Sequence, residues 1–155
     1  MLFRSWSTVQ HDATTNLSGY GTVLVTRSID ALGNATKSWT DAAGRTLRSL
    51  DQLDNATALT YDAAGNQLSV RDANNVGADM LYDALSRNTQ RTDTFSDVTK
   101  TEYDRAGNAI KQIDAKNKNT LITFDARNRR KLTTDRISAA TAFAYTALKI
   151  GRAHV

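Results

Sequence analysis

The stretch TEYDRAGNAIKQID (Thr101–Asp114) contains a tyrosine–aspartate pair, a glycine three residues after the aspartate, and a second aspartate ten residues after the first. The same arrangement occurs upstream as TYDAAGNQLSVRD (Thr60–Asp72). Two copies of one pattern indicate an internal repeat, and a repeat has to be identified before any other feature because it determines the whole fold.

The aspartates of the chain fall into two series, each with a period of 21 residues. The first series is Asp41, Asp62, Asp83, Asp104 and Asp125, and the second series is Asp30, Asp51, Asp72, Asp93, Asp114 and Asp135. Fifteen of the sixteen acidic residues are aspartates, and Glu102 is the one glutamate. The two series contain eleven of these fifteen aspartates. Short aspartate side chains bond the backbone of turns, which favours turns and strands over helices.

Other residues repeat in phase with the first series. An aromatic residue precedes most of these aspartates, and Gly, Ser or Asn follows three positions later, where a turn needs residues that tolerate positive φ. The repeat signature therefore consists of Asp41, Gly44, Asp51, Tyr61, Asp62, Gly65, Asp72, Tyr82, Asp83, Asp93, Tyr103, Asp104, Gly107, Asp114, Phe124 and Asp125.

Five or six residues separate successive turn signals, and apolar side chains alternate in the segments that lead to the aromatic residue. Leu59 and Tyr61 share one face, as do Ile122 and Phe124. After each first-series turn, Leu47, Leu68 and Ile110 repeat in phase, whereas Thr89 and Lys131 interrupt the pattern. The sequence predicts an all-β antiparallel meander of tandem 21-residue repeats over residues 23–148, with about ten or eleven strands.

These units resemble the YD repeats of the Rhs type. YDAAGNQL, YDRAGNAI and YDALSRNT carry the resemblance, which covers about Val23 to Leu148. The family includes bacterial Rhs polymorphic toxins, shell-forming subunits of insecticidal toxin complexes, and teneurins. The resemblance implies a β-sheet ribbon that spirals into a hollow shell; bacterial members enclose a C-terminal toxin or effector, and teneurins act in extracellular adhesion.

The remainder of the chain departs from this pattern. We expect residues 1–22 to be a degenerate or partial repeat, or a true start, with poor order. IGRAHV (Ile150–Val155) is what a common sequencing-adapter read gives on translation, so we interpret residues 149–155 as an artefact. The chain has no proline, whereas bacterial shells of this family end in a core with an Asp-Pro-x-Gly-Leu stretch. The resemblance therefore implies an internal segment of a shell wall.

Composition excludes several kinds of chemistry. The chain has no cysteine, which excludes disulfides, thiolate metal sites and a cysteine nucleophile. Its formal charge is +4 over 155 residues, which is typical of a soluble chain. His11 is the only histidine outside the suspect tail, which argues against a hydrolytic triad. Aspartates that recur every 21 residues indicate a structural duty rather than a unique acid–base pocket. Turns rich in Asp and Asn could bind Ca²⁺, but the known calcium-loop spacings are absent. We expect no catalytic residue, metal or cofactor.

The predicted function is a non-catalytic wall segment of a secreted or cell-surface protein whose signal peptide lies outside this sequence. Expected partners are neighbouring repeats and, through the resemblance, an encapsulated effector domain. The alternative is a module that binds carbohydrate or another cell-surface partner. The basic run RNRRK (Arg127–Lys131) is a solvated turn and strand in this interpretation, so we expect no nucleic-acid partner, and no apolar run is long enough for a membrane span.

Overall fold

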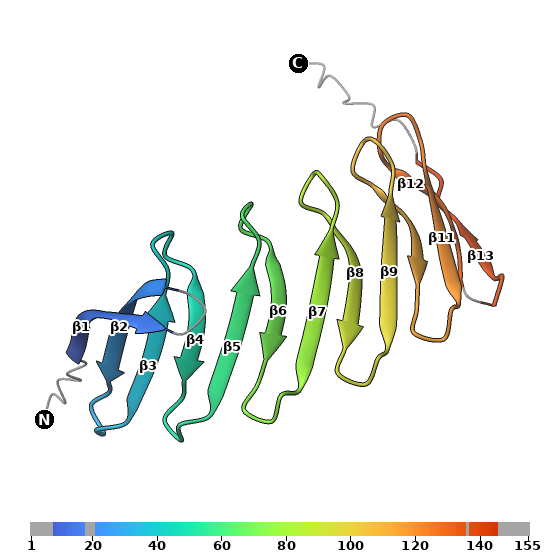
Figure 1. Cartoon of the computed structure of the whole chain (residues 1–155). Coiled ribbons are helices and arrows are strands. Elements are labelled where there is room, and N and C mark those ends of the chain that lie inside the picture. The colour runs from blue at the N-terminus through green and yellow to red at the C-terminus, as the bar shows by residue number, and fades with distance from the viewer. Residues whose placement is uncertain (1–7, 18–20, 136, 146–155) are drawn as a thin grey trace, which may run out of the picture. The chain divides into compact units, whose positions relative to one another are not determined.

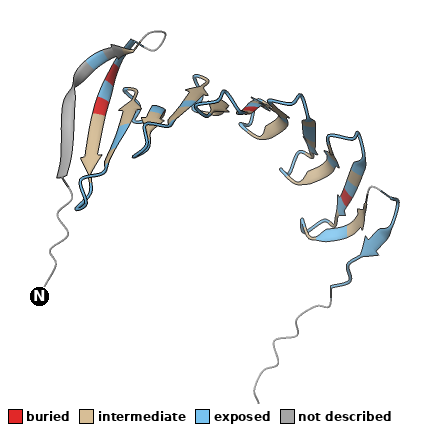
Figure 2. Ribbon diagram, turned by 90° about the horizontal axis from the view of Figure 1, so that it is seen from below, coloured by how far each residue is buried: buried red, intermediate tan, exposed pale blue. Residues whose placement is uncertain are grey.

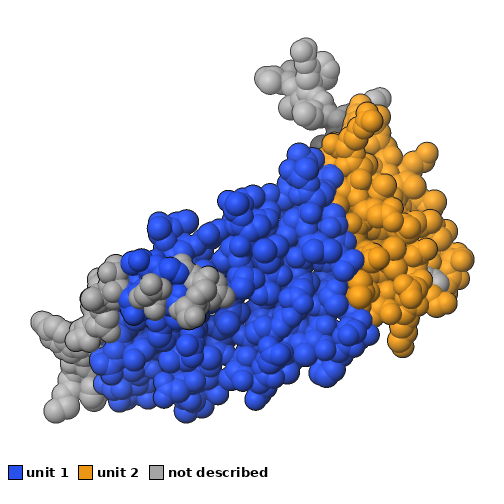
Figure 3. Space-filling model, viewed as in Figure 1, with its two compact units in different colours: residues 1–97 blue, residues 98–155 orange. Residues whose placement is uncertain are grey.

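The structure is a computed structural model that describes residues 8–17, 21–135 and 137–145. These residues form thirteen strands and no helix, so they contain no helical segment that could cross a membrane. The chain divides into two compact units, residues 1–97 and residues 98–155 (Figure 3). The structure confirms the predicted all-β meander. Residues 149–155, interpreted as an adapter artefact, lie outside the described residues.

The first unit contains eight strands that pair in chain order, each antiparallel to the next (Figure 1). They are β1 (Thr8–Leu17), β2 (Gly21–Ile29), β3 (Ala35–Thr40), β4 (Thr46–Leu50), β5 (Ala56–Tyr61), β6 (Gln67–Arg71), β7 (Gly77–Tyr82) and β8 (Asn88–Asp93). The strand β1 lies in the region where the sequence showed no repeat.

The second unit follows the same plan with five antiparallel strands in chain order. They are β9 (Val98–Tyr103), β10 (Ala109–Ile113), β11 (Asn119–Phe124), β12 (Arg130–Thr134) and β13 (Ala140–Ala142). From β2 onward the two units contain twelve strands, slightly more than predicted, because each of the eleven series aspartates begins a turn between two strands.

The two aspartate series occupy opposite ends of the strands. Within each unit the first-series turns lie along the upper edge in Figure 1 and the second-series turns along the lower edge. Strands that lead to a first-series turn, such as β5, have six residues, and strands that leave it, such as β6, have five, except β8, which has six.

Every first-series hairpin contains a β-bulge next to its turn. In the hairpin of β5 and β6, Tyr61 pairs with Gln67 but Thr60 pairs with Ser69, which leaves Leu68 as the extra residue. The equivalent extra residues are Leu47, Thr89, Ile110 and Lys131. The second-series hairpins at Asp30, Asp51, Asp72, Asp114 and Asp135 show no such shift. A bulge bends its strand and increases the local twist. The irregular series of Leu, Thr, Ile and Lys in the sequence therefore marks bulge positions rather than one buried face.

Each unit is a single-layer sheet with very little core. Strands contact only their neighbours within the unit, and five apolar residues are buried: Val23, Val25, Leu47, Ala78 and Ile122. No polar side chain is buried among the described residues, and most strand residues are half-buried (Figure 2). Because the hydrophobic effect scales with apolar area removed from water, this sheet gains little from burial within its own chain.

Gly77 offers a direct test of the backbone packing between β6 and β7. A Cβ atom at this residue would lie 1.9 Å from the backbone oxygen of Val70. We expect Gly77→Ala to lower the free energy of unfolding by about 1–3 kcal/mol, since the strands would have to separate. Thermal unfolding followed by circular dichroism measures the effect. Gly33→Asn is the control, because a Cβ there meets nothing within 4 Å and Asn occupies the same turn position at residue 75. Equal melting temperatures for the two variants would contradict the prediction.

Candidate functional site

The recurring chemical unit of the molecule is an aspartate-centred turn, shown fully by Asp41. Its Oδ1 accepts hydrogen bonds from the backbone N–H groups of Ala43 and Arg45, both at 2.9 Å. Its own N–H donates to the Arg45 carbonyl at 3.0 Å, and its carbonyl accepts from the Gly44 N–H at 2.9 Å. This is a type I turn followed by a residue with positive φ, a common three-residue hairpin loop.

The same backbone pattern occurs in all eleven turns that begin at a series aspartate. In each, the aspartate N–H donates to the carbonyl four residues on, and its carbonyl accepts from the N–H three residues on. The structure therefore places every signature aspartate at the first position of a turn. The turns of the two series therefore have the same backbone hydrogen bonds.

The fourth residue of every turn has a positive φ, which is unfavourable for most residues with a side chain. These residues are Gly33, Gly44, Asp54, Gly65, Asn75, Ser86, Ser96, Gly107, Asn117, Asn128 and Ser138. Sequence reasoning identified this position in the first series. It missed the second series, where Asp54, Ser96 and Ser138 replace glycine, although the offset of three residues from each aspartate was the available signal.

The fifth residue of the turn adds a second contact when it is Arg or Asn. The Arg45 guanidinium donates through Nε to Asp41 Oδ2 at 2.6 Å, and the Asn66 amide donates to Asp62 Oδ2 at 2.8 Å. Seven aspartates receive such a bond, and each has a pKa below its ordinary value: Asp30, Asp41, Asp51, Asp62, Asp83, Asp104 and Asp125. The side chain at the fifth position is the main cause at six of them, and the Arg45 backbone N–H is the main cause at Asp41.

The tyrosines connect one first-series hairpin to the next. The Tyr82 hydroxyl donates to the Gln67 carbonyl at 3.0 Å, and the Tyr145 hydroxyl donates to the Arg130 carbonyl at 2.8 Å. Both acceptors immediately follow the preceding first-series turn. Tyr82 is half-buried and Tyr145 is exposed, and the hydroxyl groups of both link neighbouring hairpins.

Arginine makes a second kind of connection between hairpins. The guanidinium carbon Cζ of Arg45 lies 5.1 Å from the centroid of the Tyr61 ring, and its Nη1 donates to the Asp62 carbonyl at 2.9 Å. Arg129 lies over the ring of Tyr145 at 4.3 Å. Each arginine is also paired with the aspartate of its own turn. Within the basic run Arg127–Lys131, Arg129 thus bonds the aspartate of its own turn, as expected for a run that forms a turn and strand.

The oxygens of the turns are not arranged for metal binding. Among residues 8–17, 21–135 and 137–145, no group of three or more metal-ligating side chains comes together. The Oδ1 atom of a turn aspartate such as Asp41 already accepts two backbone N–H groups, and the side chain of the fifth residue donates to Oδ2. The signature residues therefore form a row of structural turns rather than a shared pocket.

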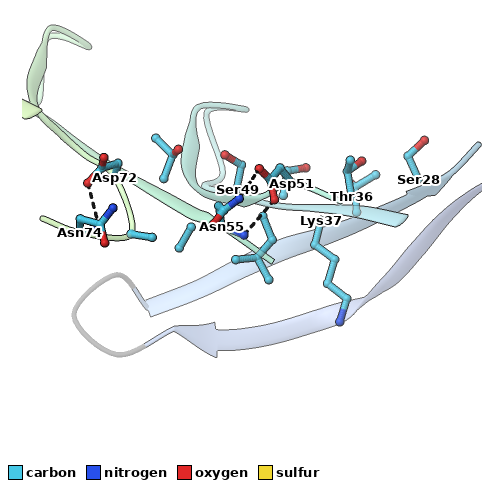
Figure 4. A pocket seen from close by; sticks show the side chains of 14 residues that line it. Ser28, Thr36, Lys37, Ser49, Asp51, Asn55, Asp72 and Asn74 are labelled. Carbon is cyan, nitrogen blue, oxygen red and sulfur yellow. Dashed lines mark hydrogen bonds between the residues drawn. The ribbon is translucent and has the colours of Figure 1, made fainter. Parts of the chain in front are cut away.

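A concave surface lies elsewhere, on one face of β2 to β5. It is a groove of about 480 Å³ lined by hydroxyl side chains, by apolar side chains such as Leu50 and Ala56, and by the turns at Asp51 and Asp72 (Figure 4). The lining includes Thr26, Ser28, Thr36, Ser38, Ser49 and Thr57. We refer to it as the hydroxyl groove. Ser and Thr at alternate strand positions are typical of any solvated sheet face, so the sequence alone did not indicate this groove.

Comparison with known proteins identifies the repeat. The family model "RHS Repeat" matches residues 30–76, a segment that begins at a second-series aspartate and contains the turns at Asp41 and Asp62. The same turn geometry continues outside this segment as far as Asp135. A search of curated proteins finds no match.

Replacing a turn aspartate should destabilise the sheet. Asp62→Ala removes the acceptor for the Asn66 N–H and amide groups. We expect the melting temperature to fall by about 2–4 °C, the shift that a typical hydrogen-bonded cap produces in a domain of this size. Circular dichroism melting measures the change.

The matched control is Asp97→Ala, because Ala139 holds the same fifth position in the turn at Asp135. Asp54 lies outside both series but is unsuitable as a control, since its φ of 60° would strain an alanine. A melting temperature that falls equally in Asp62→Ala and Asp97→Ala would show that the series aspartates have no special role.

The pKa shifts predict loss of stability in acid. The Arg129 side chain lowers the pKa of Asp125 to about 2, whereas an unfolded aspartate titrates near about 4. A depressed pKa means that the contribution of this carboxylate is complete above about pH 4 and is lost as the pH falls toward about 2. Carbon-13 NMR titration of Asp125 should show the low pKa, and Arg129→Ala should raise it. Titration of Asp125 near pH 4 in the unsubstituted chain would refute the prediction.

Proposed function

We propose that this chain, in which residues 30–76 match the Rhs-repeat family model, is a non-catalytic structural segment, part of the wall of a larger β-shell. In the bacterial relatives such a wall encloses a C-terminal toxin or effector. The observation that carries the proposal is the single-layer sheet, which repeats one hairpin unit and buries only five apolar residues.

The contacts of the sheet support a wall rather than an active site. Hydrogen bonds of the turns, the tyrosine hydroxyls and the arginines all run within a hairpin or between successive hairpins. Stability in such arrays comes from each repeat and from its contacts with the next repeat. A regular row of equivalent turns offers no unique pair of groups for acid–base or nucleophilic catalysis.

The partners of this wall are, in our proposal, the neighbouring repeats of the parent protein and an enclosed effector domain. The parent protein is secreted or displayed on the cell surface, as is typical of Rhs-repeat proteins. Large exposed side chains at the second-series turns, including Leu32, Leu53 and Phe95, are 78–88% exposed. Apolar side chains so exposed favour a chain that is covered by other parts of its parent.

The test is limited proteolysis of the parent protein. Deletion of residues 41–82 removes two whole repeat units and keeps the alternation of strands and turns, so the remaining sheet can still form. We expect the enclosed terminal domain to resist protease in the unaltered protein and to be cleaved at least about tenfold faster in the deletion variant. Circular dichroism of the variant should retain the β-sheet spectrum.

The matched control is deletion of residues 41–55, which removes fifteen residues and places successive turns out of phase. We expect this variant to lose part of its β-sheet signal, whereas deletion of residues 41–82 should leave the signal per residue unchanged. A terminal domain that is equally accessible to protease with and without residues 41–82 would exclude the enclosing role, and turnover of a substrate by the chain itself would exclude the non-catalytic role.

A further inference from the structure

The two units of the chain carry net charges of opposite sign. Residues 1–97 contain eleven acidic and eight basic residues, whereas residues 98–155 contain five acidic and twelve basic residues. The contrast is sharpest in the turns. The four second-series turns of the first unit contain six aspartates and no lysine or arginine, whereas the first-series turns of the second unit contain Arg105, Arg127 and Arg129. Opposite charges on defined edges of a molecule can direct a specific contact.

Two neighbouring second-series turns of the first unit have carboxylates with spare acceptor capacity. We call the turns at Asp72 and Asp93 the acidic turn pair. In each turn the Oδ1 atom of the aspartate accepts two backbone N–H groups, and no described side chain donates to Oδ2. The fifth residue explains this, because it is a valine in one turn and Asp97 in the other, and neither side chain is a donor. Asp97 is exposed and adds a third carboxylate.

Two neighbouring first-series turns of the second unit have spare cations. We call the turns at Asp104 and Asp125 the basic turn pair. The side chains of Arg105 and Arg127 are exposed at the tips of these turns, and neither forms an ion pair with another described residue. The series aspartates of the pair are already occupied, because the fifth residue of each turn donates to Oδ2 at 2.9 and 2.8 Å.

Both turn pairs have a fixed and matching interval. Successive turns of one series are separated by two strands, or about 10 Å. In the acidic turn pair, the Thr94 hydroxyl accepts the Gly77 N–H at 2.7 Å, and the Thr94 N–H donates to the Gly77 carbonyl at 3.1 Å. In the basic turn pair, the Asn108 amide donates to Asn128 Oδ1 at 3.1 Å. These bonds connect the two turns of each pair, so the carboxylates of one pair and the cations of the other are spaced alike.

Apolar groups at the two turn pairs are also complementary. Phe95 is 78% exposed at the tip of the acidic turn pair. The tips of the basic turn pair contain the small exposed residues Ala106 and Ala126 beside the arginines. Arginine stems cover apolar surface and the guanidinium stacks on aromatic rings, as Arg45 already does on a tyrosine of the same chain. Contact between the two pairs would therefore remove the Phe95 ring from water.

We propose that the acidic turn pair of one copy of this chain binds the basic turn pair of a second copy. Arg105 and Arg127 donate to the carboxylates of Asp72, Asp93 and Asp97, since the planar guanidinium fork matches a carboxylate. Because the two surfaces differ, the contact is heterologous, and each copy can bind two neighbours. The proposal is independent of the wall function, since it follows from the two turn pairs alone.

Sedimentation velocity of the full chain at low and high salt measures this association. We expect oligomers that grow with protein concentration at about 0.1 M sodium chloride and dissociate at about 1 M, because the Debye length falls from about 10 Å to about 3 Å. Association through the unpaired backbone of edge strands would not respond to salt in this way. A chain that stays monomeric at the lower salt concentration, or oligomers that are indifferent to salt, would overturn the proposal.

An exchange of charge between two variants identifies the surfaces. Arg105→Glu, Arg127→Glu makes the basic turn pair acidic, and Ala73→Arg, Asn74→Lys, Asp97→Lys makes the acidic turn pair basic. Lysine or arginine already occupies the second, third and fifth positions of other turns, so the second variant should fold. Each variant alone should associate at least about tenfold more weakly than the unsubstituted chain. An equimolar mixture should associate again, because each variant supplies the charge that the other has lost.

The matched control is Lys116→Glu, Lys118→Glu, which changes the net charge equally but in a second-series turn of the same unit. It should associate as the unsubstituted chain does. Arg105→Ala, Arg127→Ala is a milder variant, because alanine holds both positions in the turn at Asp62, and it too should associate more weakly. The proposal fails if the mixture of exchanged variants stays monomeric, if the alanine variant associates normally, or if the control is weakened as much as the arginine variants.

Discussion

The carboxylate of one aspartate, shared between the backbone N–H groups two and four residues later, is the interaction on which this structure depends. It closes a turn whose fourth residue must adopt a positive φ. Serine, asparagine and even aspartate occupy that position in several turns, although they adopt it less readily than glycine. Bonds to the aspartate oxygens and the two backbone bonds of the turn offset this conformational cost. Without them the strands would have little reason to reverse at fixed intervals, because almost no apolar core directs their association.

With so small a core, lateral contacts between hairpins have to replace packing between layers. Backbone ladders supply most of these contacts, and Tyr82 and Arg45 add polar bonds from one first-series hairpin to the next. A tyrosine before the aspartate is therefore useful for its hydroxyl as well as for its ring. The polar bonds are directional, so they preserve the register of successive hairpins in a sheet whose two faces would otherwise specify it weakly.

Much of this fold could be predicted because its signals are local. An aspartate and a residue that tolerates positive φ, three positions apart, determine where the chain turns, and the period of 21 residues determines the order of the strands. Three features were less accessible. Leu68 and Thr89 gave no sign that they share a β-bulge, since a bulge is defined by pairing with another strand. Ser96 and Ser138 gave weak turn signals, and the hydroxyl groove required the register of four strands.

The side chain at the fifth position of the first-series turns alternates between arginine and asparagine: Arg45, Asn66, Arg87, Asn108 and Arg129. Arg45 reaches both its own Asp41 and the carbonyl of the next turn, whereas Asn66 bonds its own Asp62. The arginine side chain of such a turn therefore forms a hydrogen bond to the first-series hairpin that follows it, as Arg45 does. The tyrosine of the next hairpin makes a further connection after both kinds of turn. Tyr82 donates to the Gln67 carbonyl after an asparagine turn, and Tyr145 donates to the Arg130 carbonyl after an arginine turn. The tyrosine connection therefore follows the 21-residue signature, whereas the alternation of arginine and asparagine at the fifth position has a period of two units, or 42 residues. The segment 30–76 that matches the family model contains one first-series arginine turn and one first-series asparagine turn, and so includes both side chains of this longer period.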